Sequence, residues 1–312
     1  MIKLKRYVNN PILNPIPEHD WEAKAVFNTA AIYLDNQVHL VYRAMSHDNI
    51  STFGYASSDD GINIDTRLAE PIYVPRIEEE KTKNPGGNSG CEDPRITQIG
   101  DTLYMCYTAF DGVNPTRVAL TTISVEDFLN HNWNWAVPKI ITPPGIDSKN
   151  ACVLPEIING KYYIFHRFYP CIWIDAVDDL NFGENDWVKG SAWIKPRSDK
   201  WDSRKIGIAG PPIKTDHGWL LIYHAITESD RHYRLGAILL KLDNPTQTLA
   251  RTDYYLFEPR LEFELDGQED DVVFSCGSVV IDDNLYVYYG GADKSIGIAT
   301  CNFTELVNDL IP

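Results

Sequence analysis

The sequence predicts an all-β fold, namely a five-bladed β-propeller in a single domain (residues 1–312) with short peripheral helices. Aromatic residues make up 12% of the 312 residues, and Gly and Pro are spread along the chain. This mixture is typical of many short strands joined by turns. In addition, a pattern of two apolar strands around a tight polar turn occurs five times, and internal repeats of this kind indicate a propeller.

Each copy starts with a short apolar strand, turns at Asp, Asn or Gly residues, and continues into an aromatic-rich strand. In chain order the copies occupy residues 30–34 and 38–43, 93–96 and 103–108, 154–157 and 162–167, 211–214 and 219–224, and 277–280 and 285–289. Aligned on Tyr42, Tyr107, Phe165, Tyr223 and Tyr288, they are 65, 58, 58 and 65 residues apart. The outer strands are expected at 52–56, 117–121, 171–174, 234–239 and 296–300. One such unit suits one propeller blade, so five copies predict five blades.

Short helices are expected outside these repeats. Ser124 begins a capping-box pattern ahead of Phe128, and the tail from Phe303 to Ile311 fits one or two helical turns. No linker rich in Pro, Gly or Ser divides the chain, which favours one domain.

Composition also narrows the function. A formal net charge of -16 disfavours nucleic acid or an anionic membrane as partner, because both need clustered Lys and Arg. The N-terminus has no apolar signal segment and no stretch has the length of a membrane span, so a cytoplasmic protein is expected. The six Cys show no CxxC spacing and are expected to be reduced and buried. No metal site is expected, and the acidic run 269–271 fits a solvated turn.

The main candidate for catalysis is a Gly-rich loop, residues 84–95, which brings Glu92 and Asp93 to the start of a strand. Glycine lets a backbone approach a ligand closely, and Pro94 is expected to hold Asp93 in an extended conformation. A turn in which the two acids only cap or solvate the backbone is the alternative.

Polar residues also recur at corresponding places in the copies. If the copies superpose, one tier holds Arg43, Thr108, His166, Arg167, His224 and Tyr289, and a second holds Asn28, Asp93, Lys149, Asn150 and Lys214. These tiers place an acid opposite a group of cations at the mouth of the channel, where ligands bind. Taken singly, Arg43 also fits an ion pair between blades, the two His fit buried core residues, and the two Lys fit solvated loops. Tyr223 at the mouth is a candidate for stacking on a sugar.

The residues around this loop resemble glycoside hydrolase family 130. The resemblance rests on the segment 90–96 (Gly-Cys-Glu-Asp-Pro-Arg-Ile), with 27–30, 42–43, 210–214, 276–277 and 288–293, and it covers nearly the whole chain. This family contains mannoside phosphorylases and some β-mannosidases on a five-bladed propeller.

The resemblance implies an inverting phosphorolysis of a β-linked mannoside, with no cofactor and with inorganic phosphate as co-substrate. Asp93 would be the general acid, delivering its proton through the 3-hydroxyl of the mannose, and α-mannose 1-phosphate would be released. The mannoside would be held by Asn28, Arg43, Asp60, Glu92, Tyr223 and Asp293. Phosphate would be held by Lys149, Asn150, His166, Arg167, Lys214 and His224. Lys149 stands where Arg is often found in the family, and Lys is a point charge rather than a fork.

Two alternatives remain: a β-mannoside hydrolase on the same scaffold, with Glu156 as a candidate base, and a non-catalytic glycan-binding propeller. The retained cations favour the phosphorylase. The linkage (β-1,4 or β-1,2) and the acceptor sugar are left open, and a homo-oligomer is compatible with the sequence.

Overall fold

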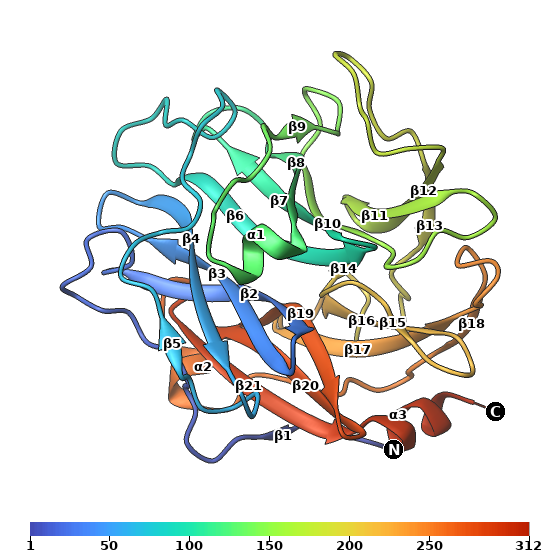
Figure 1. The fold of residues 1–312 in the computed structure, drawn as a ribbon. Helices are drawn as coiled ribbons and strands as arrows, with labels where there is room; N and C mark the ends of the chain where they lie inside the picture. Colours follow the sequence, from blue (N-terminus) through green and yellow to red (C-terminus); the bar gives the residue numbers. More distant parts are fainter. Residues whose placement is uncertain (312) are drawn as a thin grey trace.

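The structure, a computed structural model, describes residues 1–311 and is built almost entirely of β-strands (Figure 1). Most strands belong to five consecutive antiparallel meanders. The first contains β2 (Ala25–Leu34), β3 (Gln37–Met45), β4 (Ile50–Ser58) and β5 (Thr66–Arg67). The second contains β6 (Ser89–Ile99), β7 (Thr102–Phe110), β8 (Arg117–Ser124) and β9 (Lys139–Ile140). The third contains β10 (Ser148–Val153), β11 (Tyr162–Phe168), β12 (Cys171–Val177) and β13 (Ser191–Ile194).

The last two meanders are less regular. The fourth contains β14 (Lys205–Ile208), β15 (Ile213–Lys214), β16 (Trp219–Ile226), β17 (Tyr233–Leu240) and β18 (Thr248–Arg251). The fifth contains β19 (Val273–Ile281), β20 (Asn284–Gly291) and β21 (Ser295–Asn302), and β1 (Lys5–Arg6) from the N-terminus pairs with β21. The five units therefore correspond to the five predicted copies, with the last sheet completed by the start of the chain.

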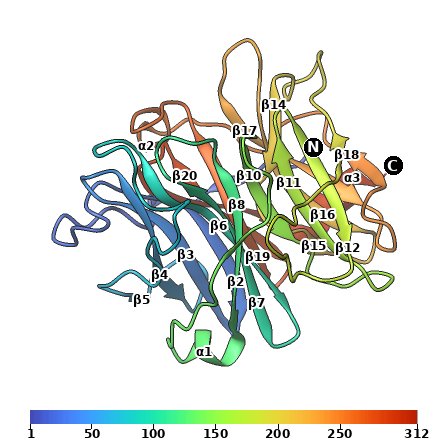
Figure 2. The same cartoon turned by 90° about the horizontal axis from the view of Figure 1, so that it is seen from above.

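The meanders pack in a cyclic order. Strand β19 packs on β2, β2 on β6, β6 on β10, and β10 on β14, while β17 packs back on β19. Figure 1 shows the blue first meander between the teal second one and the red fifth one. Figure 2, from above, shows the first meander on the side opposite the third and fourth. A short parallel ladder between β4 and β6 joins the first two meanders into one eight-stranded sheet. Five apolar clusters fill the contacts between neighbouring meanders, including the contact between the fifth and the first. The nearly all-β prediction is confirmed, whereas the five-bladed propeller stays a prediction that this packing favours.

A buried carboxylate contacts one ring in each meander. The pairs are Tyr42 with Glu22, Tyr107 with Glu80, His166 with Asp175, Tyr223 with Asp202, and Tyr289 with Glu264. The donor and acceptor atoms are 2.9 Å apart in the first pair and 2.7 Å apart in the last. Buried carboxylates need such donors because an unpaired buried charge is costly.

These rings correct the predicted alignment of the copies. A bulge in β10 pairs Lys149 with Arg167 and Cys152 with Phe165, which leaves His166 opposite the bulge. Tyr42 lies opposite a bulge of β2 in the same way. His166 is therefore the counterpart of Tyr42, and Phe165 is not. In the fifth meander Tyr289, rather than Tyr288, carries the contact to the carboxylate.

Three short helices lie outside the sheets: α1 (Val125–Leu129), α2 (Glu262–Leu265) and α3 (Phe303–Leu310). Ser124 caps α1 by accepting from the backbone of Asp127, as the sequence predicted. Helix α3 buries Leu306, Val307 and Leu310 against the core of the fourth and fifth meanders. All six cysteines are free and buried.

Candidate active site

A cavity of about 500 Å³ opens where the first strands of the meanders begin. All five meanders contribute to it, through their first two or three strands and the adjoining loops. Its lining residues are Asn28, Arg43, Glu92, Asp93, Lys149, Asn150, Arg167, Arg204, Lys205, Ile226, Arg231, Tyr233, Glu269, Asp270, Val272, Phe274 and Asp293.

Three first strands carry a β-bulge at the cavity, in β2 after Phe27, in β6 after Glu92 and in β10 after Lys149. The next residue in each strand has a left-handed backbone, with φ of 48° at Asn28, 54° at Asp93 and 54° at Asn150. Asn and Asp tolerate this conformation better than most residues, and bulges commonly re-aim side chains beside active sites. The extended conformation predicted for Asp93 is wrong, because the bulge turns its backbone into the left-handed region despite Pro94.

At one end of the cavity a single guanidinium holds two carboxylates. Arg43 donates from Nη1 to Oδ1 of Asp93 (3.2 Å) and from Nη2 to Oε1 of Glu92 (2.9 Å). Asn28 donates to the same Asp93 oxygen at 2.9 Å, and Ser51 accepts from Nε of Arg43. Asp93, Glu92 and Arg43 are all buried. This acidic end is therefore a preorganised group of donors and acceptors.

The charges at this end separate the pKa values of two carboxyls. Burial alone would raise the pKa of Asp93, but Arg43 and Arg95 outweigh it and hold that pKa below its usual value. Burial, opposed by the charge of Arg43 and assisted by the nearby charge of Asp93, raises the pKa of Asp293 to about 7. Asp93 is ionised in the free protein, whereas Asp293 is about half protonated at neutral pH.

Arg95 fixes the position of the acidic end through hydrogen bonds to the backbone. Its fully buried guanidinium donates to the carbonyls of Asp93 (2.9 Å), Ala209 (2.8 Å) and Ile208 (3.1 Å). The Arg95 side chain therefore links the backbone at Asp93, in the second meander, to residues 208 and 209 at the end of β14, in the fourth meander.

The opposite end of the cavity is cationic. Lys149 and Arg167 face each other across β10 and β11, and Arg204, Lys205 and Arg231 join them. Burial, together with the charges of Arg167 and Lys149, lowers the pKa of Lys205 to about 8. Nε of Arg167 and Oδ1 of Asn150 are buried without a hydrogen-bond partner within residues 1–311. Five cations and unpaired polar atoms in one pocket suit an anionic ligand.

His224 lies behind the cationic end and does not line the cavity. Its ring is 4.3 Å from that of Phe274, and neither ring nitrogen has a partner within the described chain. Burial, with the charges of Arg167 and Arg95, holds the pKa of His224 well below its usual value, so the ring is neutral. A side chain at Gly207 would collide with Nε2 of His224 and with Oδ1 of Asn150, so this glycine keeps the space between them open.

Eight predicted residues lie together in the cavity: Asn28, Arg43, Glu92, Asp93, Lys149, Asn150, Arg167 and Asp293. Five others lie outside it, and one of these is His224, described above. Asp60 caps an exposed turn by accepting from the backbone of Ile62 and Asn63, and Lys214 pairs with Glu156 at the surface. His166 and Tyr223 point into their own meanders, where buried carboxylates bind them.

Several lining residues were missed, and the most informative is Lys205. The sequence places the first strand of the fourth copy at 211–214. In the structure β14 is that first strand, and it pairs with β16 so that Lys205 lies opposite Ile226 and Ile208 lies opposite Tyr223. The signal in the sequence for this strand, and for Lys205 at its start, is the basic pair at 204–205 followed by the apolar run 206–209. Glu269 and Asp270 line the cavity too, so the acidic run read as a solvated turn belongs to the site.

Comparison with known proteins agrees with this arrangement. Residues 3–311 match the profile of glycoside hydrolase family 130, described as beta-1,4-mannooligosaccharide phosphorylase.

The chain belongs to glycoside hydrolase family 130. Two family 130 relatives from Thermoanaerobacter sp. (strain X514) are each 42% identical: a beta-1,2-mannobiose phosphorylase, over 96% of this chain and 97% of its own, and a 1,2-beta-oligomannan phosphorylase, over 98% and 99%. The solved structure of a beta-1,2-mannobiose phosphorylase from Listeria innocua in complex with beta-1,2-mannobiose superposes with a TM-score of 0.82 at 27% identity, over 99% of both chains. This family 130 protein is therefore an enzyme.

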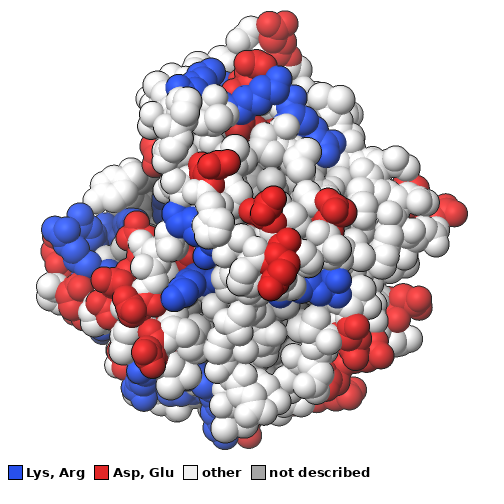
Figure 3. Space-filling model, turned by 90° about the vertical axis from the view of Figure 1, so that its left-hand side faces the viewer, with Lys and Arg blue, Asp and Glu red and all other residues white. Residues whose placement is uncertain are grey.

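The surface of the family 130 chain is mixed in charge. On the face drawn in Figure 3, Lys and Arg form small groups interrupted by Asp and Glu, and that face of residues 1–311 has no continuous basic surface. Within the same residues no helix is long and apolar enough to cross a membrane, and no group of three or more His, Cys, Asp or Glu is arranged to hold a metal ion.

Proposed function

We propose that this enzyme cleaves β-1,2-linked mannosides with inorganic phosphate and releases α-mannose 1-phosphate. The observation that carries the proposal is one cavity with two ends: Asp93 held by Arg43 at one end, and Lys149, Arg167 and Lys205 at the other. The first end suits a sugar and an acid catalyst, and the second suits a phosphate dianion. The names of the relatives at 42% identity support the β-1,2 linkage.

In the proposed step, a phosphate oxygen forms a bond to the anomeric carbon while the bond from that carbon to the glycosidic oxygen breaks. The leaving oxygen takes up a proton that originates on Asp93 and passes through the 3-hydroxyl of the mannose, as the family resemblance implies. The attack comes from the face opposite the leaving group, so the configuration inverts. Phosphate arrives as an anion and needs no general base, but it must be held in line, which is the role of the cations.

The remaining residues take roles according to their place in the cavity. Asn28, Arg43, Glu92 and Asp293 would bind hydroxyls of the mannose whose bond is cleaved. Asn150 would complete the phosphate site with a neutral polar side chain. Lys205 would take the role first expected of Lys214, which lies outside the cavity.

We also propose that the five meanders are the blades of one five-bladed propeller. Their cyclic packing order and the five apolar clusters between neighbours support this arrangement. A central position for the cavity follows, because every meander contributes to its lining.

The hydrolase alternative needs a carboxylate that activates water. Glu156, the base considered from the sequence, pairs with Lys214 at the surface and does not line the cavity, which argues against that role.

Product analysis tests the proposal directly. The enzyme is incubated with β-1,2-mannobiose or β-1,4-mannobiose, each with and without inorganic phosphate. We expect mannose 1-phosphate from β-1,2-mannobiose only when phosphate is present. Equal release of free mannose with and without phosphate would establish hydrolysis instead, and no reaction with either sugar would leave a binding function.

A further inference from the structure

Lys149 lies between the two ends of the cavity. On one side it faces Arg167 across the β10–β11 ladder, within the cationic group. On the other side its Nζ is 3.7 Å from Oε2 of Glu92, the carboxylate next to Asp93. One ammonium group is therefore shared between the phosphate end and the acidic end.

The other cations near Asp93 are fixed. Arg95 is fully buried and binds three backbone carbonyls. Arg43 is buried and bonded to Ser51, Glu92 and Asp93. The Lys149 side chain is 31% exposed, and its contact with Glu92 is long for a hydrogen bond. Among these three cations, Lys149 is the one that an arriving anion can draw away.

The free cavity presents a problem for acid catalysis. Arg43, Arg95 and Lys149 all lower the pKa of Asp93, so its carboxyl is ionised and has no proton to donate. The charged and titratable groups around Asp93 on the surrounding elements are Arg43, Glu92, Arg95, Lys149, Arg167, Tyr233, Cys276 and Asp293, and Asn28 donates a hydrogen bond to it. Something in the reaction cycle must reduce the positive field at Asp93 before it can act.

We propose that Lys149 couples phosphate binding to protonation of Asp93, so that the protonated fraction of the acid catalyst rises when the nucleophile is in place. The inference rests on the proposed function. Phosphate binds Lys149, and the two negative charges of the phosphate offset the positive field of the cationic end. The fraction of Asp93 that has taken up a proton from solvent then rises, by about tenfold for a shift of one pH unit, and this form donates its proton during cleavage.

This coupling has a chemical purpose. An enzyme in which fewer Asp93 carboxyls are protonated before phosphate arrives protonates the glycosidic oxygen less often while only water is present. Hydrolysis of the mannoside is thereby suppressed. A lysine suits the task because its ammonium is a mobile point charge on a flexible stem, whereas an arginine fork is held by planar geometry.

The test follows the titration of Asp93 itself. The carboxyl resonance is observed by carbon-13 NMR of Asp-labelled protein and assigned by its loss in Asp93→Asn. Inorganic sulfate serves as the probe because it takes up a proton only in strongly acidic solution, whereas phosphate itself titrates near neutral pH. In the wild type we expect sulfate to raise the titration midpoint of Asp93 by about one pH unit, the effect of one nearby charge.

Variants at Lys149 separate coupling from simple anion binding. In Lys149→Gln we expect the midpoint without sulfate to be already about one unit higher than in the wild type, and sulfate to add little. Lys149→Arg keeps the charge and should keep the low midpoint in the free protein. Lys161→Gln removes an exposed lysine that pairs with Asp178 and should behave like the wild type.

An unchanged midpoint in sulfate-free Lys149→Gln would overturn the inference, and this reading does not depend on whether the variant binds sulfate. A wild-type midpoint that saturating sulfate does not move would overturn it as well. Failure of the proposed function looks different, because the wild-type enzyme would then form no mannose 1-phosphate from β-1,2-mannobiose.

Discussion

At the scale of single residues, Asp93 has an unusual setting for an acid catalyst. It is buried beside two arginines that keep it charged, on a left-handed backbone at a bulge. Asp93→Asn keeps the shape and the contact with Arg43 but has no carboxyl proton. We expect the rate of mannose 1-phosphate formation to fall by about 100- to 10,000-fold, as for loss of a general acid. Initial rates measure the loss, and calorimetry with β-1,2-mannobiose should show that sugar binding survives; a fall of less than about tenfold would contradict the role.

Lys205 gives a pH prediction. Its pKa of about 8 means that it is a cation below that pH and neutral above it. Phosphate binding should therefore weaken as the pH rises through about 8, and the KM for phosphate should rise there. In Lys205→Gln the KM for phosphate should be higher throughout and its pH dependence near 8 should be lost.

Lys214→Gln is the matched control, because Lys214 is exposed and pairs with Glu156 outside the cavity. Exposed ion pairs contribute about 0–1 kcal/mol to stability, so this variant should keep the stability and the phosphate KM of the wild type. If Lys214→Gln instead weakens phosphate binding more than Lys205→Gln, our assignment of Lys205, rather than Lys214, to the phosphate site is wrong.

At the scale of elements, the ring-to-carboxylate contacts stabilise the meanders. The hydroxyl of Tyr223 donates to buried Asp202 at 2.8 Å and accepts from Arg251 at 3.2 Å. Tyr223→Phe removes this hydroxyl, and a hydrogen bond to a charged group contributes about 1.5–3 kcal/mol. We expect a loss of that size in the free energy of unfolding, measured with urea, while the KM for the mannoside stays unchanged. A normal stability with a raised KM for the mannoside would instead support the sugar-binding role that the sequence predicts for Tyr223.

The elements also show what the sequence can and cannot predict. Five repeats of strand, turn and strand are encoded locally, so the meanders and the loop at Asp93 were found without the structure. The end of β14 makes a contact that is distant in sequence, since Arg95 binds the carbonyls at 208 and 209, and the local pattern does not encode it. A pair of prolines at 211–212 resembled the start of the other copies and led to Lys214 rather than Lys205. In β10 the bulge shifts the pattern by one position, so Arg167 lines the cavity as predicted, whereas His166 turns to Asp175.

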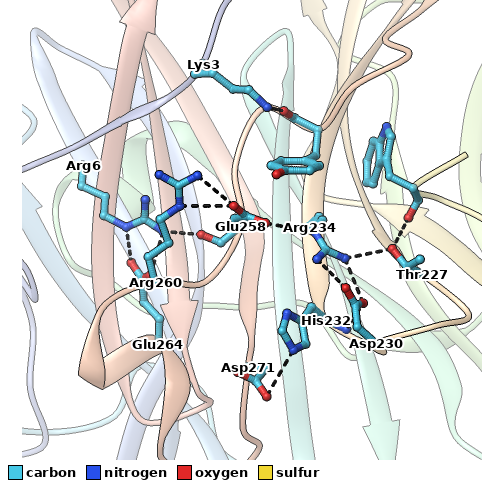
Figure 4. Close-up of polar contacts among 12 residues, drawn as sticks. Lys3, Arg6, Thr227, Asp230, His232, Arg234, Glu258, Arg260, Glu264 and Asp271 are labelled. Atoms are coloured by element: carbon cyan, nitrogen blue, oxygen red, sulfur yellow. Dashed lines mark hydrogen bonds and ion pairs between the residues drawn. The ribbon is translucent and has the colours of Figure 1, made fainter.

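At the scale of the whole molecule, the N-terminus holds the fifth sheet in place. Arg6 donates from Nε and Nη2 to both oxygens of Glu264, at 2.8 and 2.7 Å, and Glu264 is fully buried (Figure 4). Arg6→Ala leaves this carboxylate without its cation. Breaking a buried pair in this way costs about 3–5 kcal/mol, which urea unfolding should report.

Arg260 provides the control for Arg6. It also pairs with a glutamate, Glu258, but its side chain is 65% exposed. Arg260→Ala should change the free energy of unfolding by no more than about 1 kcal/mol. Equal effects of the two variants would mean that the contact between the N-terminus and the fifth sheet contributes little to stability.

The pairing of β1 with β21 has a consequence for synthesis of the protein. Lys5 pairs with Thr300, and the amino group of Met1 lies 2.9 Å from Asp309. The residues of β1 therefore leave the ribosome long before their partners in β21 and α3 are translated. During that interval β1 cannot pair with the fifth sheet, and Leu4 has no core to enter. Early segments with exposed apolar residues are prone to aggregate, so this chain should depend on chaperones until β21 and α3 have been translated.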